Sequence, residues 1–353
     1  MSTYARIADL PLLIDDYALD VRALSLGPDF RRLTTVIHLR GGSHEGLGED
    51  VGYEPRDHEA QMGAGPVLPL AGAFTLESFS RHLDALDLFH AGPPGHDAFR
   101  DYRRWAFESA ALDLALRQAG ASLADALGLV LSPVRFVVST RLDPPGADRV
   151  TRWLDRDPTL RFKLDPTDEW PDTLIDELAA RGVVEVMDMK GQYPMDDLPF
   201  EVPVEPRTYS RIVAAFPNAF IEDPRLDPPA LRETLRGHEG RVTWDAPIHS
   251  VADVLAREWP PTTINVKPSR CGPVRTLLDL YDHLGAAGIG AYAGGQTELG
   301  PGRGQVQYLA SLFHPDAPND IAPSGYNDPE PPDALPSSPL PVAASAIGFR
   351  WES

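Results

Sequence analysis

Short apolar runs separated by amphipathic stretches fill the chain from about Val134 onward. Segments between them, such as DTLIDELAARG, repeat apolar residues at helical spacing. Strands that alternate with helices predict a parallel sheet covered by helices, and about eight such units favour a (β/α) barrel of the TIM type. The eight runs are VRFVV, LRFKL, VVEVMD, AFIED, RVTWD, TTINVK, GIGAYA and NDIAP.

The first third of the chain has a different texture. The alternating run RLTTVIHLRG and the glycine-rich segment GGSHEGLGEDVGYEP predict antiparallel strands joined by loops. From Asp101 to Ala119 apolar residues recur at near-helical spacing, and Gly120 follows as a cap. The segment DPEPPDALPSSPLP is too rich in proline for regular structure. We therefore expect an α+β capping domain over 1–128, the barrel over 129–325, and a return segment over 326–353 that packs on the cap.

Composition narrows the range of partners. The chain has 353 residues and a net charge of −20, which disfavours nucleic acid and anionic membranes as partners. Its N-terminus lacks a basic stretch followed by an apolar one, and no apolar run is as long as a membrane span. We expect a soluble, cytoplasmic protein whose partner is a small molecule. The sequence leaves the oligomeric state open, and a homo-oligomer is compatible with a capped barrel.

Lysine is rare and its placement is informative. The chain has three lysines, Lys163, Lys190 and Lys267, and each lies within two residues of the end of an apolar run. Lysine can lose its proton near neutral pH when it is desolvated, so it can act as a base where arginine cannot. The placement suggests chemistry, although a general bias against lysine codons would also make the residue rare.

Acidic residues close three consecutive runs. Asp188, Glu222 and Asp245 stand at the ends of the third, fourth and fifth runs, and Lys267 ends the sixth. The carboxyl ends of barrel strands face the active site, so these side chains should meet there. Carboxylate oxygens are ligands that Mg²⁺ prefers, and three buried acids without a cation would repel one another. The pattern predicts a magnesium site.

These residues resemble the enolase superfamily, in particular the branch that contains muconate lactonizing enzyme, o-succinylbenzoate synthase and the dipeptide epimerases. The resemblance implies a modified, enolase-like barrel beneath an N-terminal cap. The motifs that carry it are the GxGE-like turn at Gly46, Gly48 and Glu49, the helix that begins WAFESAALDLALRQAG, the strand RFKLD, the strand ends VMDMK, IEDP and TWDAP, the strand INVKPSR and the turn GGQTELG.

The resemblance also implies roles for individual residues. Asp188, Glu222 and Asp245 would bind one Mg²⁺, and Lys163 and Lys267 would lie on opposite faces of a bound carboxylate substrate. Glu298, in the turn GGQTELG, would belong to the wall of the site. Substrate selection would fall to the cap loops over 26–31 and 43–53.

The implied activity is removal of the α-proton of a carboxylate through a metal-stabilised enediolate. Racemisation or epimerisation, cycloisomerisation and elimination are all outcomes of that step, so the enzyme would be an isomerase or a lyase. One alternative is a metal-binding barrel that has lost this chemistry. Another is a metal-free pair of carboxyl groups acting as general acid and base.

Two positions depart from the family pattern. The family's second barrel strand carries KxK, whereas alternation here places Arg161, Lys163 and Asp165 on one side of the strand. Lys163 is then either the first lysine, with Asp165 in the place of the base, or the second, with Arg161 in the first place. The third strand of the family ends DxN, and here Lys190 takes the last position, on the same side as Asp188. Lys190 either enters the site or extends to solvent.

Overall fold

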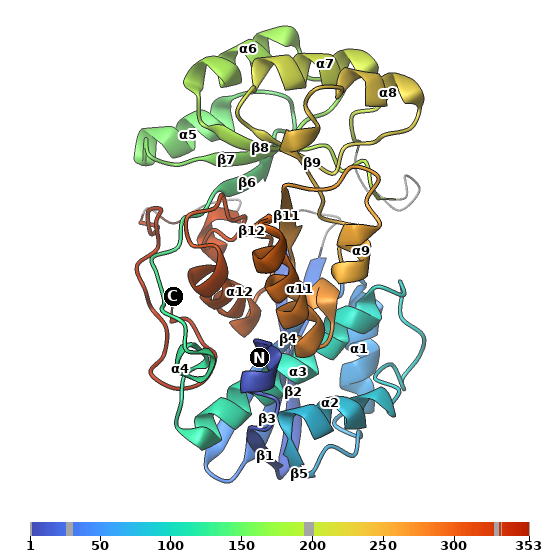
Figure 1. Cartoon of the computed structure of the whole chain (residues 1–353), viewed down its shortest axis with the longest axis vertical. Helices are drawn as coiled ribbons and strands as arrows, with labels where there is room; N and C mark the ends of the chain where they lie inside the picture. The colour runs from blue at the N-terminus through green and yellow to red at the C-terminus, as the bar shows by residue number, and fades with distance from the viewer. Residues whose placement is uncertain (1, 26–30, 194–200, 328–331, 333, 353) are drawn as a thin grey trace.

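The computed structural model describes residues 2–25, 31–193, 201–327, 332 and 334–352. An antiparallel domain lies at the bottom of the molecule in Figure 1, and parallel strands with their helices lie above it. None of the helices in the described parts of the chain combines the length and apolarity that crossing a bilayer requires. Residues 26–30, most of one predicted selection loop, lie outside the described ranges.

The cap consists of a three-stranded antiparallel sheet in the order β2-β3-β4, a β1-β5 pair, and helices packed against them. The predicted helix over 101–119 is confirmed as α3, which ends at Gly120 in the left-handed conformation. The elements are η1 (Tyr4–Arg6), β1 (Pro11–Ile14), β2 (Asp16–Ser25), β3 (Arg31–Gly41), β4 (His44–Asp50), α1 (Pro55–Ala64), β5 (Gly72–Thr75), α2 (Leu76–Asp84), α3 (Phe99–Ala119) and α4 (Leu123–Leu127).

The glycine-rich segment after β3 is mostly a strand. Its residues 44–50 form β4, and the turn is confined to the positions around Gly42. A Cβ on Gly46 would lie 2.1 Å from the Ala110 carbonyl oxygen, and one on Gly48 would lie 2.0 Å from that of Ala106. The lack of a side chain at these two glycines therefore allows β4 to pack closely on α3. From composition alone, glycines of this kind could equally have formed a turn.

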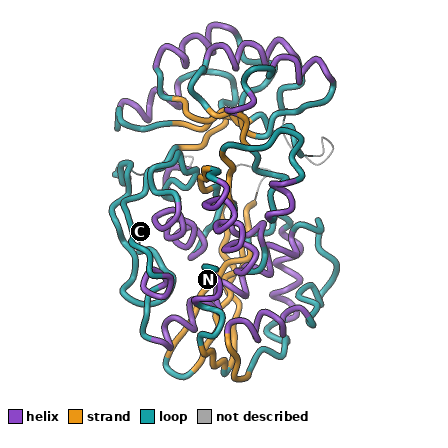
Figure 2. Tube along the Cα trace, viewed as in Figure 1, coloured by secondary structure: helices purple, strands orange, loops and turns teal. Residues whose placement is uncertain are grey.

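The C-terminal part contains two parallel sheets, one in the order β10-β9-β8-β7-β6 and one of β11 and β12. Figure 2 shows these short strands apart from the longer strands of the cap. The elements are β6 (Val138–Arg141), α5 (Asp148–Arg156), β7 (Phe162–Asp165), α6 (Asp172–Arg181), β8 (Val184–Asp188), α7 (Pro206–Ala215), β9 (Phe220–Glu222), α8 (Pro229–Thr234), η3 (Glu239–Arg241), β10 (Val242–Thr243), α9 (Val251–Leu255), β11 (Thr263–Val266), α10 (Pro268–Cys271), α11 (Val274–Ala287), β12 (Gly290–Ala293), α12 (Pro301–Phe313) and η4 (Ser324–Asn327).

The predicted alternation of strand and helix is confirmed, but the barrel is not closed by one continuous ladder. On one side, the backbone hydrogen bond from Asn265 N to Trp244 O, at 3.0 Å, links the two sheets. On the other side, the eighth run lies between them: Asp320 N donates to Ala293 O at 2.8 Å, and Val137 N donates to Asn319 O at 2.8 Å. The eighth apolar run contributes isolated bridges instead of a strand. The first run is also displaced, because β6 begins only at Val138, where the apolar stretch ends.

Buried polar contacts fix the cap to the loop that follows β12. The carboxylate of Glu49 is fully buried and accepts hydrogen bonds from the backbone N–H groups of Leu299, Gly300 and Gly302 at 2.7–3.0 Å. The guanidinium of Arg32 donates to the carbonyl of Gln296 at 2.8 Å. The glutamate of the GxGE-like motif therefore holds the loop over 296–302 in place.

The C-terminal residues return to the cap. Phe349 N donates to Asp113 on α3 at 2.8 Å, and Gly348 forms an isolated bridge with Ser122. This segment is drawn in red along α12 and α4 in Figure 1. Part of the proline-rich stretch, residues 328–331 and 333, lies outside the described ranges.

Candidate active site

The ammonium group of Lys163 lies among three carboxylates. Its Nζ is 2.6 Å from Glu222 Oε1, 3.0 Å from Asp188 Oδ2 and 3.3 Å from Asp320 Oδ2. The side chains of Lys163, Asp188 and Glu222 are at most 2% exposed. These contacts follow from the parallel register, in which β7 pairs with β8 and Asp188 stands beside Glu222 on β9.

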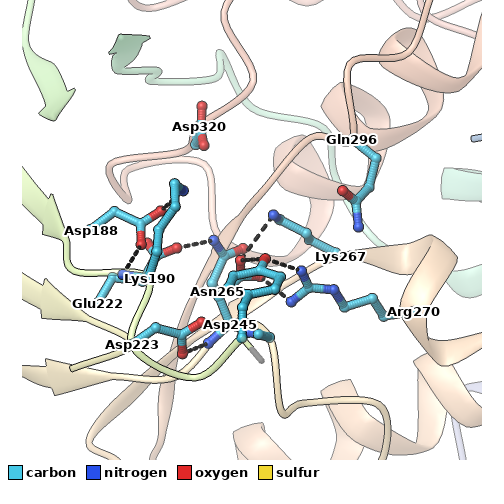
Figure 3. Close-up of polar contacts among 12 residues, drawn as sticks. Asp188, Lys190, Glu222, Asp223, Asp245, Asn265, Lys267, Arg270, Gln296 and Asp320 are labelled. Carbon is cyan, nitrogen blue, oxygen red and sulfur yellow. Dashed lines mark hydrogen bonds and ion pairs between the residues drawn. The ribbon is translucent and has the colours of Figure 1, made fainter. Parts of the chain in front are cut away.

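A second charged group surrounds Asp245, immediately after β10. Lys267 Nζ lies 2.9 Å from Asp245 Oδ2, and the Arg270 guanidinium lies 2.7 Å from Asp245 Oδ1. Arg270 also donates to the hydroxyl of Tyr193 at 2.6 Å. In Figure 3, Asn265 lies between this group and the Asp188–Glu222 group.

Neutral side chains hold Glu222 from the other strands. Tyr292, on β12, donates to Glu222 Oε2 at 2.6 Å, and Asn265, on β11, donates to Glu222 Oε1 at 3.2 Å. Thr243 Oγ1 is 2.8 Å from the Tyr292 hydroxyl. Strands on both sides of the cluster therefore fix this carboxylate.

Asp223 follows Glu222 and serves the backbone. Its φ of 46° turns the chain, and its two oxygens accept hydrogen bonds from the N–H groups of Asp245 and Ala246 at 2.8 Å each. Asp223 thereby fixes the position at which Asp245 enters the site.

The electrostatics of the cluster reflect burial set against pairing. Burial raises the pKa of Glu222, and repulsion by Asp188 adds to the rise, so that it reaches about 8 despite Lys163. Burial and the neighbouring Asp245 raise the pKa of Asp223 to about 7. Burial also raises the pKa of Asp245, but Arg270 and Lys267 outweigh it and lower the value to about 2.

The lysines show the opposite balance. Burial alone would lower the pKa of Lys163, but Asp188 and Glu222 outweigh it and raise the value well above the ordinary one. Asp245 raises the pKa of Lys267 in the same way, against the effect of burial. Both amines are therefore charged as long as these carboxylates face them.

Lys190 enters the site. Its φ is 47°, its backbone N–H donates to Asp188 Oδ1 at 3.1 Å, and its ammonium lies 2.5 Å from Asp188 Oδ2 and 3.5 Å from Asp165 Oδ2. Arg161 instead lies toward the other end of the strand and donates to the carbonyl of Thr159. Lys163 and Asp165 therefore face the cluster and Arg161 does not, as expected if Lys163 takes the first position of the KxK pattern.

Glu298 does not contact the acid cluster in the described residues. Its Oε1 accepts from Gln296 N at 2.7 Å, and its Oε2 lies 3.0 Å from Arg303. The Gln296 side chain donates to the Tyr102 hydroxyl at 2.9 Å and accepts from Tyr53 at 3.2 Å. The loop that contains Glu298 is therefore joined to the cap through Gln296, which lies on the Lys267 side of the site in Figure 3.

The donor chemistry of this cluster fits Mg²⁺, since carboxylate oxygens are its preferred ligands. Six acids face four cations, and this excess of negative charge accompanies the raised pKa of Glu222. Within the described ranges, however, no three acidic, histidine or cysteine side chains are arranged to hold a metal ion. We predicted a metal ion because buried acids repel one another. In this structure the amines of the lysines relieve that repulsion. The acids are Asp165, Asp188, Glu222, Asp223, Asp245 and Asp320, and the cations are Lys163, Lys190, Lys267 and Arg270.

Several residues of the cluster were not predicted from the sequence. Asn265 and Tyr292 face it from β11 and β12, and two-residue alternation back from Lys267 would have found Asn265. Asp320 belongs to the eighth apolar run, which ends without a marked polar residue. Arg270 and Tyr193 lie beyond the strands, where periodicity carries no signal.

The fold and this constellation of strand-end acids and lysines define a class: the chain has the enolase-superfamily fold, in a divergent form, as its sequence motifs predicted. The chain belongs to the family described as domain of unknown function DUF8230, whose N-terminal domain matches residues 5–126 and whose C-terminal domain matches residues 130–328. No curated protein sequence matches it.

Solved structures with this fold cover nearly the whole chain. A dipeptide epimerase from Enterococcus faecalis is 16% identical, with a TM-score of 0.66 over 96% of this chain and 99% of that one. A putative mandelate racemase/muconate lactonizing enzyme from Sorangium cellulosum is 17% identical, with a TM-score of 0.68 over 96% and 98%. A dipeptide epimerase from Methylococcus capsulatus, complexed with Mg and the dipeptide L-Arg-D-Lys, is 18% identical, with a TM-score of 0.60 over 85% and 86%.

Proposed function

We propose that this protein is a Mg²⁺-dependent enzyme that removes the α-proton of a small carboxylate substrate. The observation that carries the proposal is the pair of buried lysines, Lys163 and Lys267, which reach the strand-end acids from β7 and from the end of β11. The names of the structural neighbours, which are epimerases, racemases and a muconate cycloisomerase, support an enzyme of this general type.

Asp188, Glu222 and Asp245 would hold the ion. When bound, Mg²⁺ would supply positive charge to the carboxylate oxygens of the substrate as the α-proton leaves. Glu222 is preorganised for this role because Tyr292 and Asn265 fix its two oxygens. Asp245 would be preorganised as well, because the carboxylate of Asp223 accepts a hydrogen bond from its backbone N–H group.

Asp165 takes the place of the family's base in this register, so Lys163 is proposed as the base on one face of the substrate because it is the amine that this strand retains. Lys267 is the opposite base or a cationic stabiliser. The proton would pass from the α-carbon to a neutral Nζ. Burial lowers the pKa of both lysines, and the facing carboxylates, Asp188 and Glu222 for Lys163 and Asp245 for Lys267, are the main groups that raise it. A lysine whose carboxylate partners were neutralised would therefore lose its proton more readily, as a base must.

The remaining candidate residues have supporting roles in this proposal. Lys190, held between Asp188 and Asp165, would add positive charge suited to a second anionic group on the substrate. The carboxylate of Glu298 would orient Gln296 by accepting a hydrogen bond from the backbone N–H group of Gln296. These contacts do not select between epimerisation, cycloisomerisation and elimination.

A second candidate is an enolase-like barrel that binds metal but no longer removes α-protons. The observation that favours it is Asp165 at the position where the KxK pattern has its second lysine. In this structure the carboxylate of Asp165 lies 3.5 Å from the ammonium of Lys190.

Exchange of α-protons in deuterated water tests the proposal. Dipeptides and other carboxylic acids are incubated with the wild-type protein, with Lys163→Ala and with Lys267→Ala, each in Mg²⁺ and in EDTA. We expect deuterium incorporation by the wild type in Mg²⁺, and its loss in EDTA and in at least one lysine variant. Incorporation that neither variant changes would refute the assignment of the lysines. Incorporation that EDTA does not change would refute the metal.

A further inference from the structure

A cavity of about 480 Å³ lies outside the acid cluster, with none of the described acids or cations of that cluster in its lining. Its walls come from the loops after β8 and β9, from α8, from Trp244 and from the residues that follow α9. A volume of this size is typical of small-molecule sites. Three of its lining residues are arginines: Arg225, Arg232 and Arg257.

The cavity borders the sheet at Trp244, the residue that follows β10. Thr243 contacts the Tyr292 hydroxyl, whereas Trp244 donates its indole N–H to the carbonyl of Trp259. Among the described residues, the cavity is lined by none of the acids or cations of the cluster, although Gly191 directly follows Lys190 in the chain.

The charges that line the cavity are unevenly paired. Arg232 forms a bidentate ion pair with Glu258, at 2.6 and 2.8 Å. The guanidinium of Arg225 forms no hydrogen bond or ion pair with any described residue. Among the described residues, Arg257 donates a hydrogen bond from Nε to the Asp253 carbonyl at 3.1 Å, and its guanidinium lies 5.8 Å from the centroid of the Trp244 ring.

Two guanidinium groups thus face the cavity with donors to spare. The cavity is lined by two acids, Asp227 and Glu258. Glu258 pairs with Arg232, and Asp227 forms no ion pair with any described residue. The lining carries a net positive charge in a protein whose net charge is −20. Arginine is the side chain best suited to bidentate binding of carboxylate and phosphate groups.

We propose that this cavity is a binding site for a small organic dianion, either a dicarboxylate or a phosphate monoester, held by Arg225 and Arg257. Each guanidinium donates to acidic oxygens of the anion, and Arg232 remains paired with Glu258. The proposal is independent of proton abstraction at the acid cluster, because it rests on residues that are not members of that cluster.

Calorimetric titration tests this site directly. Succinate and inorganic phosphate are titrated separately into the full chain without Mg²⁺, with ionic strength matched by sodium chloride. The variants are Arg225→Ala and Arg257→Ala. Arg81→Ala is the control of equal charge change, because Arg81 lies on α2 in the cap and pairs with Glu77.

Saturable binding of at least one probe by the wild type is expected. Each cavity variant should weaken it about tenfold or more, since a hydrogen bond to a charged group is lost. Arg81→Ala should leave it unchanged, and Arg225→Lys should retain part of the affinity. The stronger probe identifies the acidic group that the cavity prefers. Thermal unfolding of each variant checks that it is folded.

Three results would overturn the proposal: no saturable binding of either probe, equal weakening by Arg81→Ala, or weakening by Lys267→Ala but not by Arg225→Ala. The last result would assign the anion to the acid cluster. None of these results bears on α-proton exchange, which is measured separately with Mg²⁺ present.

Discussion

Replacement of Lys163 by methionine tests whether this amine is the internal counter-ion of the acid cluster. Methionine keeps much of the length of the side chain and removes its charge. Lys163 is 2% exposed and pairs with Asp188, Glu222 and Asp320, so the change leaves buried carboxylates without their partner. Removing one member of a buried ion pair costs about 3–5 kcal/mol of unfolding free energy.

The loss should depend on pH. The pKa of Glu222 is already raised to about 8, chiefly by burial, so at pH 6 this carboxyl group is mostly protonated and needs no counter-ion. At pH 8.5 it is mostly ionised. We therefore expect a loss of about 3 kcal/mol at pH 6 and closer to about 5 kcal/mol at pH 8.5.

Urea unfolding, followed by circular dichroism and tryptophan fluorescence, measures this loss, and the two probes together reveal whether the two domains unfold separately. Lys190→Met is the matched control. Its side chain is 18% exposed, and Asp188 would keep Lys163 as a partner, so a smaller loss is expected. A loss below about 1 kcal/mol for Lys163→Met at both pH values would show that Lys163 does not neutralise these acids.

Three further predictions concern the cluster and the packing of the cap. Because the pKa of Glu222 is higher in the folded protein than its ordinary value of 4.5, stability should fall as pH rises from about 5 to about 8, and Glu222→Gln should flatten that fall in urea titrations. Mg²⁺, if the acids bind it, should raise the unfolding temperature more at pH 8.5 than at pH 6, because the ligands must be ionised; an equal rise at both values would contradict this. Gly48→Ala should destabilise the cap by about 1–3 kcal/mol or more through overpacking against α3, whereas Gly63→Ala, in open space on α1, should stabilise it by about 0.5–1 kcal/mol in the same unfolding assay.

Periodicity predicted the layers of this fold because each layer buries a repeating face. The alternation of apolar runs with amphipathic segments required a parallel sheet covered by helices, and β8, β9 and β11 lie within the runs that predicted them. Closure of the barrel did not follow from the pattern. The run NDIAP is apolar enough for a strand, yet its residues form only bridges to β12 and to Phe136.

Positions outside regular strands were beyond the reach of that argument. Alternation placed Lys190 on the side of Asp188, and the contact exists, but the backbone achieves it through a left-handed residue and not through a continued strand. Asp223 is turned toward the backbone by a similar conformation. Two-residue periodicity does not describe such positions, since their direction depends on local turns.

The two departures from the family pattern become intelligible when they are considered together. In the sequence, Asp165 in place of a lysine and Lys190 in place of an asparagine are separate changes, and each alone suggests a damaged site. In the structure the two side chains lie 3.5 Å apart at the carboxyl ends of β7 and β8. Because β7 and β8 are neighbours in the sheet, β8 supplies an amine, that of Lys190, at the place where β7 carries Asp165 instead of a lysine. That relation argues against simple loss of a charged group, and it identifies the Asp165–Lys190 pair as the feature in which this chain differs most from the KxK and DxN pattern.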